Sequence, residues 1–209
     1  MLSSTQRHRY ARRETLFHDG DLADTIHFIS EGRVAVHRST PAGHVAMFAV
    51  LGPGEAFGEM AMLAADRRRT SAAVALEPVI THTLRFVEFD DLCRAHPHVQ
   101  RLLVDLLSQR VARLSTHLLE ALYVPADQRV VRRLLDLCGE YDDGAAAHDV
   151  TIPLTQDEIA ELSGASRPTT NRVLRALARD GVVSLHRGHV EVLNWAALLR
   201  RSPVPTVVG

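Results

Sequence analysis

Residues 155–181, TQDEIAELSGASRPTTNRVLRALARDG, decide the fold of this chain. They begin with Thr155 and Glu158, which have the spacing of a capping box. In that motif each side chain accepts a hydrogen bond from the backbone N–H of the other residue. The pattern therefore predicts a helix that starts at Gln156.

A second helix is predicted to follow after a tight turn. Gly164 supplies the turn, Ser166 is a favourable N-cap, and Gly181 suits the position just after the helix end. Pro168 falls in the first turn, where its missing N–H costs little. Two short helices with this connection indicate a helix–turn–helix, whose second helix enters the major groove of DNA.

The outward face of this second helix is basic. Residues 166–180 contain four arginines and one aspartate, which gives a local charge of 4 − 1 = +3. Val173, Leu174 and Leu177 have the spacing of an inward face. Residues 182–193 add two apolar runs around a turn, which predict a β wing. A plain pair of antiparallel helices is the alternative, but it requires neither the arginines nor the wing.

A long amphipathic helix is predicted over residues 97–123. One row of its apolar residues has alternating steps of three and four, the heptad pattern of a two-stranded coiled coil; the row is Val104, Leu107, Val111, Leu114, Leu118 and Ala121. A second apolar set, Leu102, Leu103 and Leu106, is expected to pack on the preceding domain. Two apolar faces on one helix predict a homodimer, although a helix buried within one chain is the alternative. Pro125 ends the helix and marks a hinge.

The residues before this helix, 16–89, contain short apolar runs separated by glycines, as in an antiparallel β-sandwich or barrel. The runs cover residues 25–30, 34–37, 45–51, 72–76 and 81–86. Within this region, residues 57–63 are predicted to form a short helix whose first amides could hold an anion. Arg69 and Thr70 follow Glu59 by ten and eleven residues and could close on the same anion. The alternative is a solvated run of charges at 67–69 and a surface acid at Glu59.

Composition excludes several classes of protein. The 209 residues suffice for one large or two small domains, and no apolar run reaches the roughly 18 residues that span a bilayer. The N-terminus lacks the apolar region of a secretory signal, so we expect a cytoplasmic protein. The two cysteines, Cys93 and Cys138, are too few for an iron–sulfur or zinc site. The histidines form no metal-binding motif, so we expect no metal, no catalytic residues and no enzyme. The remote alternative is a cupin-like β-barrel enzyme.

The chain resembles the cyclic AMP receptor protein and fumarate–nitrate regulator (CRP/FNR) family of bacterial transcription factors over residues 7–195. Two motifs carry the resemblance: Phe57-Gly58-Glu59 with Arg69-Thr70-Ser71, and the run GASRPTTNRVL at residues 164–174. It implies an α+β fold with an N-terminal antiparallel β-roll, a cyclic-nucleotide-binding-like jelly roll. A long dimerisation helix and a C-terminal winged helix–turn–helix would follow. We expect these parts, with a short tail, at residues 1–95, 96–124, 125–201 and 202–209.

The resemblance also implies a ligand site for a cyclic nucleotide. Its expected residues are Gly58, Glu59, Met60, Arg69, Thr70, Ser71, Leu114 and Ser115. Glu59 would accept from the ribose 2′-hydroxyl, and Arg69 and Thr70 would hold the cyclic phosphate. Leu114 stands where the cyclic AMP receptor has a threonine that contacts adenine, so adenine specificity is open. Cyclic AMP remains the leading candidate effector, with no covalent cofactor; a regulator that needs no nucleotide or answers another signal is the alternative.

For DNA, the family pattern implies one basic surface. Its expected residues are Ser166, Arg167, Pro168, Thr169, Asn171, Arg172, Arg175 and His186. Arg167 and Arg172 would read guanines, because guanidinium fits O6 and N7 in a bidentate way. Pro168 stands where the cyclic AMP receptor has a glutamate that accepts from cytosine, so the half-site is expected to differ from that receptor's site, or to be looser, at that base. The expected partners are double-stranded DNA with two-fold symmetry, a second copy of the chain and RNA polymerase, with no membrane.

Overall fold

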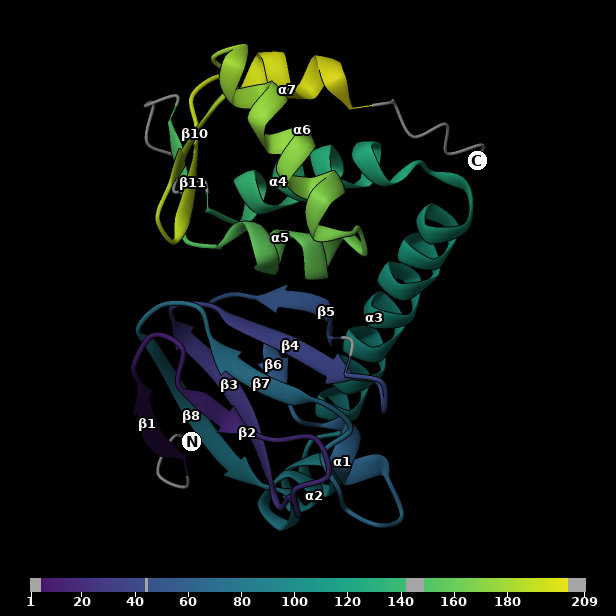
Figure 1. Cartoon of the computed structure of the whole chain (residues 1–209). Coiled ribbons are helices and arrows are strands. Elements are labelled where there is room, and N and C mark those ends of the chain that lie inside the picture. The colour runs from purple at the N-terminus through teal and green to yellow at the C-terminus, as the bar shows by residue number, and fades with distance from the viewer. Residues whose placement is uncertain (1–4, 44, 142–148, 203–209) are drawn as a thin grey trace. The chain divides into compact units, whose positions relative to one another are not determined.

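The computed structural model describes residues 5–43, 45–141 and 149–202 (Figure 1). The chain divides into two compact units, residues 1–116 and 117–209. The tail expected at 202–209 lies outside the described residues except for its first position. The domain boundaries predicted at 95 and 125 remain predictions.

The first unit contains two antiparallel four-stranded sheets, as the sequence predicts. Their strand orders are β1-β8-β3-β6 and β2-β7-β4-β5. The strands of the first sheet are Gln6–Tyr10 (β1), Thr25–Glu31 (β3), Ala56–Phe57 (β6) and Val79–Arg85 (β8). Those of the second are Thr15–Phe17 (β2), Val34–Ser39 (β4), Val45–Leu51 (β5) and Ala72–Ala75 (β7).

The core of this unit draws side chains from both sheets: Ile29, Val34, Leu51, Phe57, Ala73, Ala75 and Val79. Phe57 was expected at the start of a short helix, and this part of the prediction is wrong. The residue ends β6, where it pairs with His27 and is buried. Gly58 then turns the chain with φ of 87°, and the short helix α1 covers only Met60–Leu63. A left-handed backbone at Gly58 separates strand from helix, because residues with a Cβ rarely adopt that conformation.

Helix α2, Phe86–Ala95, is a second correction, because the sequence reading ended a strand at Phe86. The backbone N–H of Arg85 donates to Glu88 Oε2 at 3.2 Å, which starts the helix. Phe86, Phe89 and Cys93 follow steps of three and four and are all buried. They pack with residues of α3, the long helix Pro97–Tyr123.

Only part of the second apolar set on α3 packs as predicted. Leu103 and Leu106 contact the core cluster of α2, which includes Phe89. Leu102, in contrast, is 64% exposed. The three residues therefore do not share one buried face: at about 100° per residue, Leu102 lies off the line that joins Leu103 and Leu106.

The second unit holds four helices and a three-stranded sheet among its described residues (Figure 1). The helices are Ala126–Tyr141 (α4), Gln156–Ser163 (α5), Arg167–Arg179 (α6) and Trp195–Arg201 (α7). The sheet has the order β10-β11-β9, with strands Val183–His186, His189–Val192 and Val150–Ile152. The predicted two-stranded wing is confirmed in β10 and β11 and extended by β9, which pairs with β11.

The predicted caps of the two central helices are confirmed. Glu158 N–H donates to Thr155 Oγ1 at 3.2 Å, and Thr155 N–H donates to Glu158 Oε2 at 2.6 Å. Gly164 has φ of 58°, the left-handed conformation that a tight turn requires. Ser166 Oγ accepts from Thr169 N–H at 3.3 Å. Local sequence thus fixes both ends of the turn between α5 and α6.

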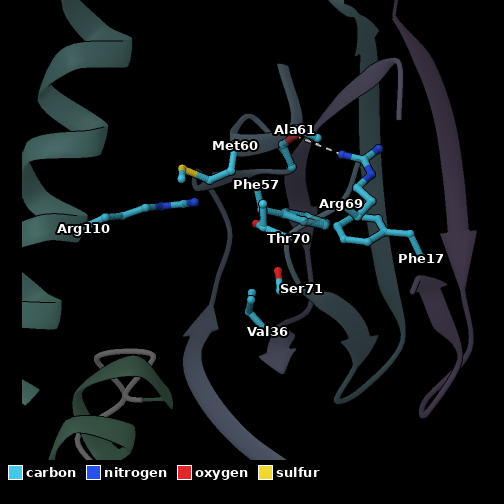
Figure 2. Close-up of a pocket in the computed structure, with 10 residues that line it drawn as sticks. Phe17, Val36, Phe57, Met60, Ala61, Arg69, Thr70, Ser71 and Arg110 are labelled. Carbon is cyan, nitrogen blue, oxygen red and sulfur yellow. Dashed lines mark hydrogen bonds between the residues drawn. The ribbon is translucent and has the colours of Figure 1, made fainter. Parts of the chain in front are cut away.

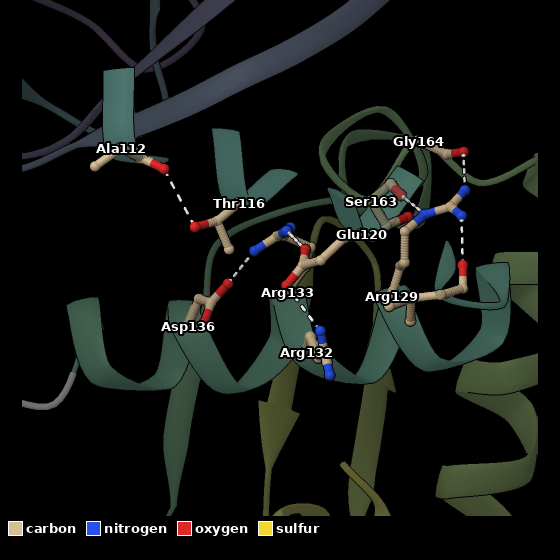
Figure 3. Close-up of polar contacts among 10 residues, drawn as sticks. Ala112, Thr116, Glu120, Arg129, Arg132, Arg133, Asp136, Ser163 and Gly164 are labelled. Atoms are coloured by element: carbon tan, nitrogen blue, oxygen red, sulfur yellow. Dashed lines mark hydrogen bonds and ion pairs between the residues drawn. The ribbon is translucent and has the colours of Figure 1, made fainter. Parts of the chain in front are cut away.

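A network of ion pairs ties the end of α3 to α4 (Figure 3). The carboxylate of Glu120 accepts from Arg132 Nη1 at 3.0 Å and from Arg133 Nη2, and Arg133 also pairs with Asp136. Arg129 donates to the carbonyl of Val124 at 2.8 Å, between α3 and α4. It also donates to the carbonyls of Ser163 and Gly164, at 3.0 Å and 2.7 Å. One arginine therefore connects the start of α4 to the turn that precedes α6.

Candidate functional site

The first unit contains a pocket whose walls surround about 320 Å³, part of it open to solvent (Figure 2). It brings together five of the predicted ligand residues: Gly58, Met60, Arg69, Thr70 and Ser71. Its other lining residues were not among the predicted ligand residues; they are Phe17, Val36, Phe57, Ala61 and Arg110. The pocket thus combines hydroxyl groups and arginines with apolar walls, a combination that suits an organic anion.

Arg69 is the central charge of this pocket and is 5% exposed. It donates to the carbonyl of Gly58 at 3.0 Å and to Thr25 Oγ1 at 3.1 Å. Its guanidinium carbon lies 4.1 Å from the ring centroid of Phe17, which Figure 2 shows beside it. A Cβ at position 58 would collide with Nη1 of Arg69, so glycine is required for this approach.

No carboxylate of the described residues lies within ion-pair distance of Arg69. Its two hydrogen bonds, to Gly58 and Thr25, use only part of the five N–H donors of a guanidinium. Burial lowers the pKa of Arg69, because the charged form is removed from water. Asp24, Asp21 and Glu59 act on Arg69 in the opposite direction, from beyond ion-pair distance. A buried cation with spare donors and no directly bound acid favours the binding of an anion.

Glu59 lies next to the pocket and is 1% exposed. Its Oε1 pairs with Arg110 Nη1, and Arg110 also donates to the carbonyl of Ala56 at 2.5 Å. Its Oε2 has no hydrogen-bond partner within the described part of the chain. Burial raises the pKa of Glu59, although the positive charge of Arg110 acts in the opposite direction. One buried carboxylate oxygen is therefore available to accept from a hydroxyl group of a ligand.

Leu114 and Ser115 do not line this pocket in the single chain described. Both are exposed on α3. Their contribution was expected from a dimer, so it remains a prediction.

In the second unit, α6 presents the predicted basic surface. Pro168, Asn171, Arg172 and Arg175, together with Arg179, line a space of about 690 Å³ that is largely open to solvent. Leu174 and Leu177 on the opposite side of α6 are buried, as predicted. Arg179 was not in the predicted set, although its spacing of four from Arg175 places it on the same face.

The remaining predicted DNA residues lie at the start of α6 and on the wing. Ser166 Oγ donates to Thr169 Oγ1 at 2.9 Å, and Arg167 Nε lies 3.0 Å from Asp157 Oδ1. His186, on β10, stacks on His189 with ring centroids 4.4 Å apart and lies 3.4 Å from Glu191. Exposed polar groups therefore lie at the start of α6 and on the wing.

The sequence matches two family models, one in each part of the chain. Residues 7–96 match the cyclic nucleotide-binding domain, and residues 128–201 match the Crp-like helix-turn-helix domain. A "Cyclic AMP receptor protein" of Thermus thermophilus is 35% identical over 197 residues, which cover 94% of this chain and 88% of that protein. A "CRP-like cAMP-activated global transcriptional regulator" of Mycobacterium tuberculosis is 30% identical, covering 92% and 86%.

Solved structures agree with these matches. A CRP-family transcriptional regulator of Thermus thermophilus is 26% identical with a TM-score of 0.76, covering 93% of this chain and 96% of that chain. FixK2 of Bradyrhizobium japonicum has a TM-score of 0.81 at 18% identity, covering 95% and 98%, which shows the shared fold.

A nucleotide-binding β domain followed by a Crp-like helix–turn–helix defines a DNA-binding transcription regulator. The chain belongs to the CRP/FNR family. Among its described helices, none has the length and apolar character needed to cross a membrane.

Proposed function

We propose that a cyclic nucleotide binds the pocket of the first unit and modulates DNA binding by a homodimer. The observation that carries this proposal is Arg69, a buried cation with no carboxylate within ion-pair distance among the described residues, in a pocket that Thr70 and Ser71 also line. A cyclic phosphate would supply the missing negative charge and accept the spare donors of Arg69. Backbone amides near Gly58 and Met60 would add further donors.

The free oxygen of Glu59 supports a ribose in the same ligand. A buried carboxylate oxygen without a partner is costly, and a ribose hydroxyl would satisfy it. Arg110 holds the other oxygen and so fixes the carboxylate. The relatives named for cyclic AMP make that nucleotide the first candidate for this chain.

We propose the following contacts between DNA and the residues of α6 and the wing. Arg167 and Arg172 would read guanines, and Arg175 would approach the same groove from the next turn of α6. Phosphates would be bound by Ser166, Thr169, Asn171 and His186. Pro168 offers no acceptor to a cytosine, so the operator would be less selective at the base pair it faces.

The exposed residues of α3 support a homodimer. Val104, Val111, Leu114 and Leu118 of the heptad row are each at least half exposed in the single chain. Parallel pairing of two such helices would bury this row. Two copies of α6 would then read half-sites about one DNA turn apart. RNA polymerase is the further partner we propose, on the basis of the family resemblance alone.

A second candidate is a regulator that binds DNA without a nucleotide. Leu114 favours it, because a leucine cannot accept a hydrogen bond from the amine of adenine. Calorimetry with cyclic AMP and with cyclic GMP, followed by a DNA shift assay with and without each, separates the two candidates. The proposal expects heat of binding for at least one nucleotide and a change in DNA affinity with it. Absence of heat for both, or equal DNA binding with and without the bound nucleotide, would contradict it.

A further inference from the structure

The ion pair between Arg167 and Asp157 joins the two helices of the DNA-binding motif. Asp157 lies in the first turn of α5, and Arg167 is the first residue of α6. The side chains are 49% and 68% exposed, with 3.0 Å between Asp157 Oδ1 and Arg167 Nε. Among the described residues, neither Arg172 nor Arg175 has such an acidic partner. The helix that leads into the groove therefore begins with an arginine restrained by an acid.

The geometry of the pair leaves the reading edge of Arg167 available. Asp157 occupies the Nε side of the guanidinium. The two terminal nitrogens remain, and bidentate contact with guanine O6 and N7 requires two donors. An unrestrained arginine loses side-chain conformational entropy when DNA orders it. An acid that already restricts the side chain reduces that loss.

The contribution of this ion pair to folding stability is too small to explain its presence. Exposed ion pairs typically contribute little to folding stability, because water and salt screen them. A carboxylate close to the DNA surface also opposes binding, because contacts to phosphates dominate affinity for any sequence. Asp157 therefore costs affinity for all DNA, and a gain in sequence discrimination would offset that cost, since specificity is a difference between affinities.

We propose that Asp157 is a specificity-determining residue: it positions Arg167 for base reading and lowers affinity for DNA of unrelated sequence. This proposal rests on the proposed function, which assigns Arg167 to a base. Asp157 lies outside the predicted set of DNA-binding residues. It would lower the affinity for DNA, whereas the arginines of that set would raise it.

The test compares Asp157→Asn with the unchanged full-length protein on three kinds of DNA. These are an operator selected from random DNA by the unchanged protein, its single base-pair variants, and random-sequence DNA. Anisotropy titrations at one fixed salt concentration would give the affinities. We expect Asp157→Asn to bind random DNA about threefold more tightly. Discrimination should fall about fivefold at one base pair in each half-site and stay unchanged elsewhere.

Two further variants make the result specific. Asp180→Asn removes the same charge at the other end of α6, where the acid pairs with Arg201 and not with Arg167, so it should leave discrimination at every base pair unchanged. In an Arg167→Ala background, Asp157→Asn should cause no further loss of discrimination at that base pair, because the two residues act together.

Three outcomes would overturn the proposal. If Asp157→Asn weakens binding to all DNA and lowers the melting temperature, the residue only stabilises the start of α5. If the variant binds every DNA more tightly with unchanged discrimination, Asp157 acts only through its charge. If Arg167→Ala leaves discrimination intact at every position, the assignment of Arg167 to a base is wrong. The first two outcomes leave that assignment in place, so the two failures can be distinguished.

Discussion

Two buried arginines of this chain, Arg69 and Arg133, differ in the partners that they bind. Arg69 is 5% exposed, binds a carbonyl and a hydroxyl, and has no carboxylate within ion-pair distance in the described residues. Arg133 is 7% exposed and pairs with both Glu120 and Asp136. Both side chains lose their hydration, but only Arg133 forms direct ion pairs; Asp24, Asp21 and Glu59 favour the charge of Arg69 without lying within ion-pair distance.

The two buried glutamates repeat this difference. Each oxygen of Glu120 accepts from an arginine, whereas Oε2 of Glu59 has no partner in the described part of the chain. Buried charged groups that are all paired with opposite charges support the folded structure. A buried charged group that lacks a partner lowers the stability of the fold until a ligand supplies that partner, so it indicates a binding site. We therefore interpret the network at Glu120 as structural and propose that the set at Glu59 and Arg69 binds the ligand.

The largest expected effect is on stability in the second unit. Glu120→Gln leaves Arg133 buried with one acid in place of two, and removal of one partner of a buried pair typically costs about 3–5 kcal/mol. Since Asp136 remains, we expect a loss near 3 kcal/mol in the free energy of unfolding, measured by urea denaturation. As a control, Asp180→Asn in the same unit removes an exposed ion pair to Arg201 and should cost less than about 1 kcal/mol. Equal losses in the two variants would remove the distinction between completed and surface pairs.

The next effect is on ligand affinity in the first unit. Arg69→Gln removes the buried cation, and a hydrogen bond to a charged group contributes about 1.5–3 kcal/mol. Calorimetry should therefore show cyclic nucleotide affinity reduced about 10- to 100-fold. The loss of stability should be smaller than for Glu120→Gln, because Arg69 leaves no buried acid unpaired. Arg68→Gln removes the same charge from an exposed neighbour and should bind the nucleotide normally. A normal affinity in Arg69→Gln would show that the unpaired cation is not the anion site.

The smallest effect is a shift in the titration of His27. Its pKa is lowered to about 3, first by burial and next by the positive charge of Arg69. In Arg69→Gln the pKa of His27 should rise, by less than about one unit, and stay below its ordinary value because the burial remains. NMR of the imidazole ring would follow the titration. An unchanged pKa would indicate that solvent or a bound ion already screens Arg69.

The lowered pKa of His27 also has a consequence for stability. The folded state binds the proton less readily than the unfolded state, so His27 favours folding above pH 6.5, and this contribution is lost as pH falls towards 3. In Arg69→Gln, the part of this acid destabilisation that comes from Arg69 should disappear.

The helix–turn–helix was predictable from sequence because local interactions specify it. Thr155, Gly164 and Ser166 each act within a few residues, and the structure confirms all three roles. Helix α2 was missed although Phe86, Phe89 and Cys93 carry a helical spacing, because the apolar run before them reads as a strand. The spacing at 86, 89 and 93 was the signal that could have identified it.

The charge balance of the pocket could not be read from the sequence. Arg110 lies 51 residues after Glu59 in the sequence. Phe17, which also lines the pocket, belongs to β2, far earlier in the sequence. Their approach depends on how sheets and helix pack, which no local pattern encodes. The motif predicted Arg69 as a ligand residue, but only the fold shows that no carboxylate of the described residues lies within ion-pair distance of it.

The most direct test of the division between the two charged sets is the melting temperature with and without saturating cyclic nucleotide, measured for three proteins in parallel. A ligand at 100 times its dissociation constant stabilises by about 2.7 kcal/mol. The unchanged protein and Glu120→Gln should therefore show the same upward shift, although Glu120→Gln starts from a lower temperature. Arg69→Gln should show a shift reduced by about half or more at the same concentration, because a 10- to 100-fold weaker affinity leaves about 0.4–1.4 kcal/mol of stabilisation. A full shift in Arg69→Gln, or no shift in the unchanged protein, would contradict the claim that the incomplete set of charges is the ligand site.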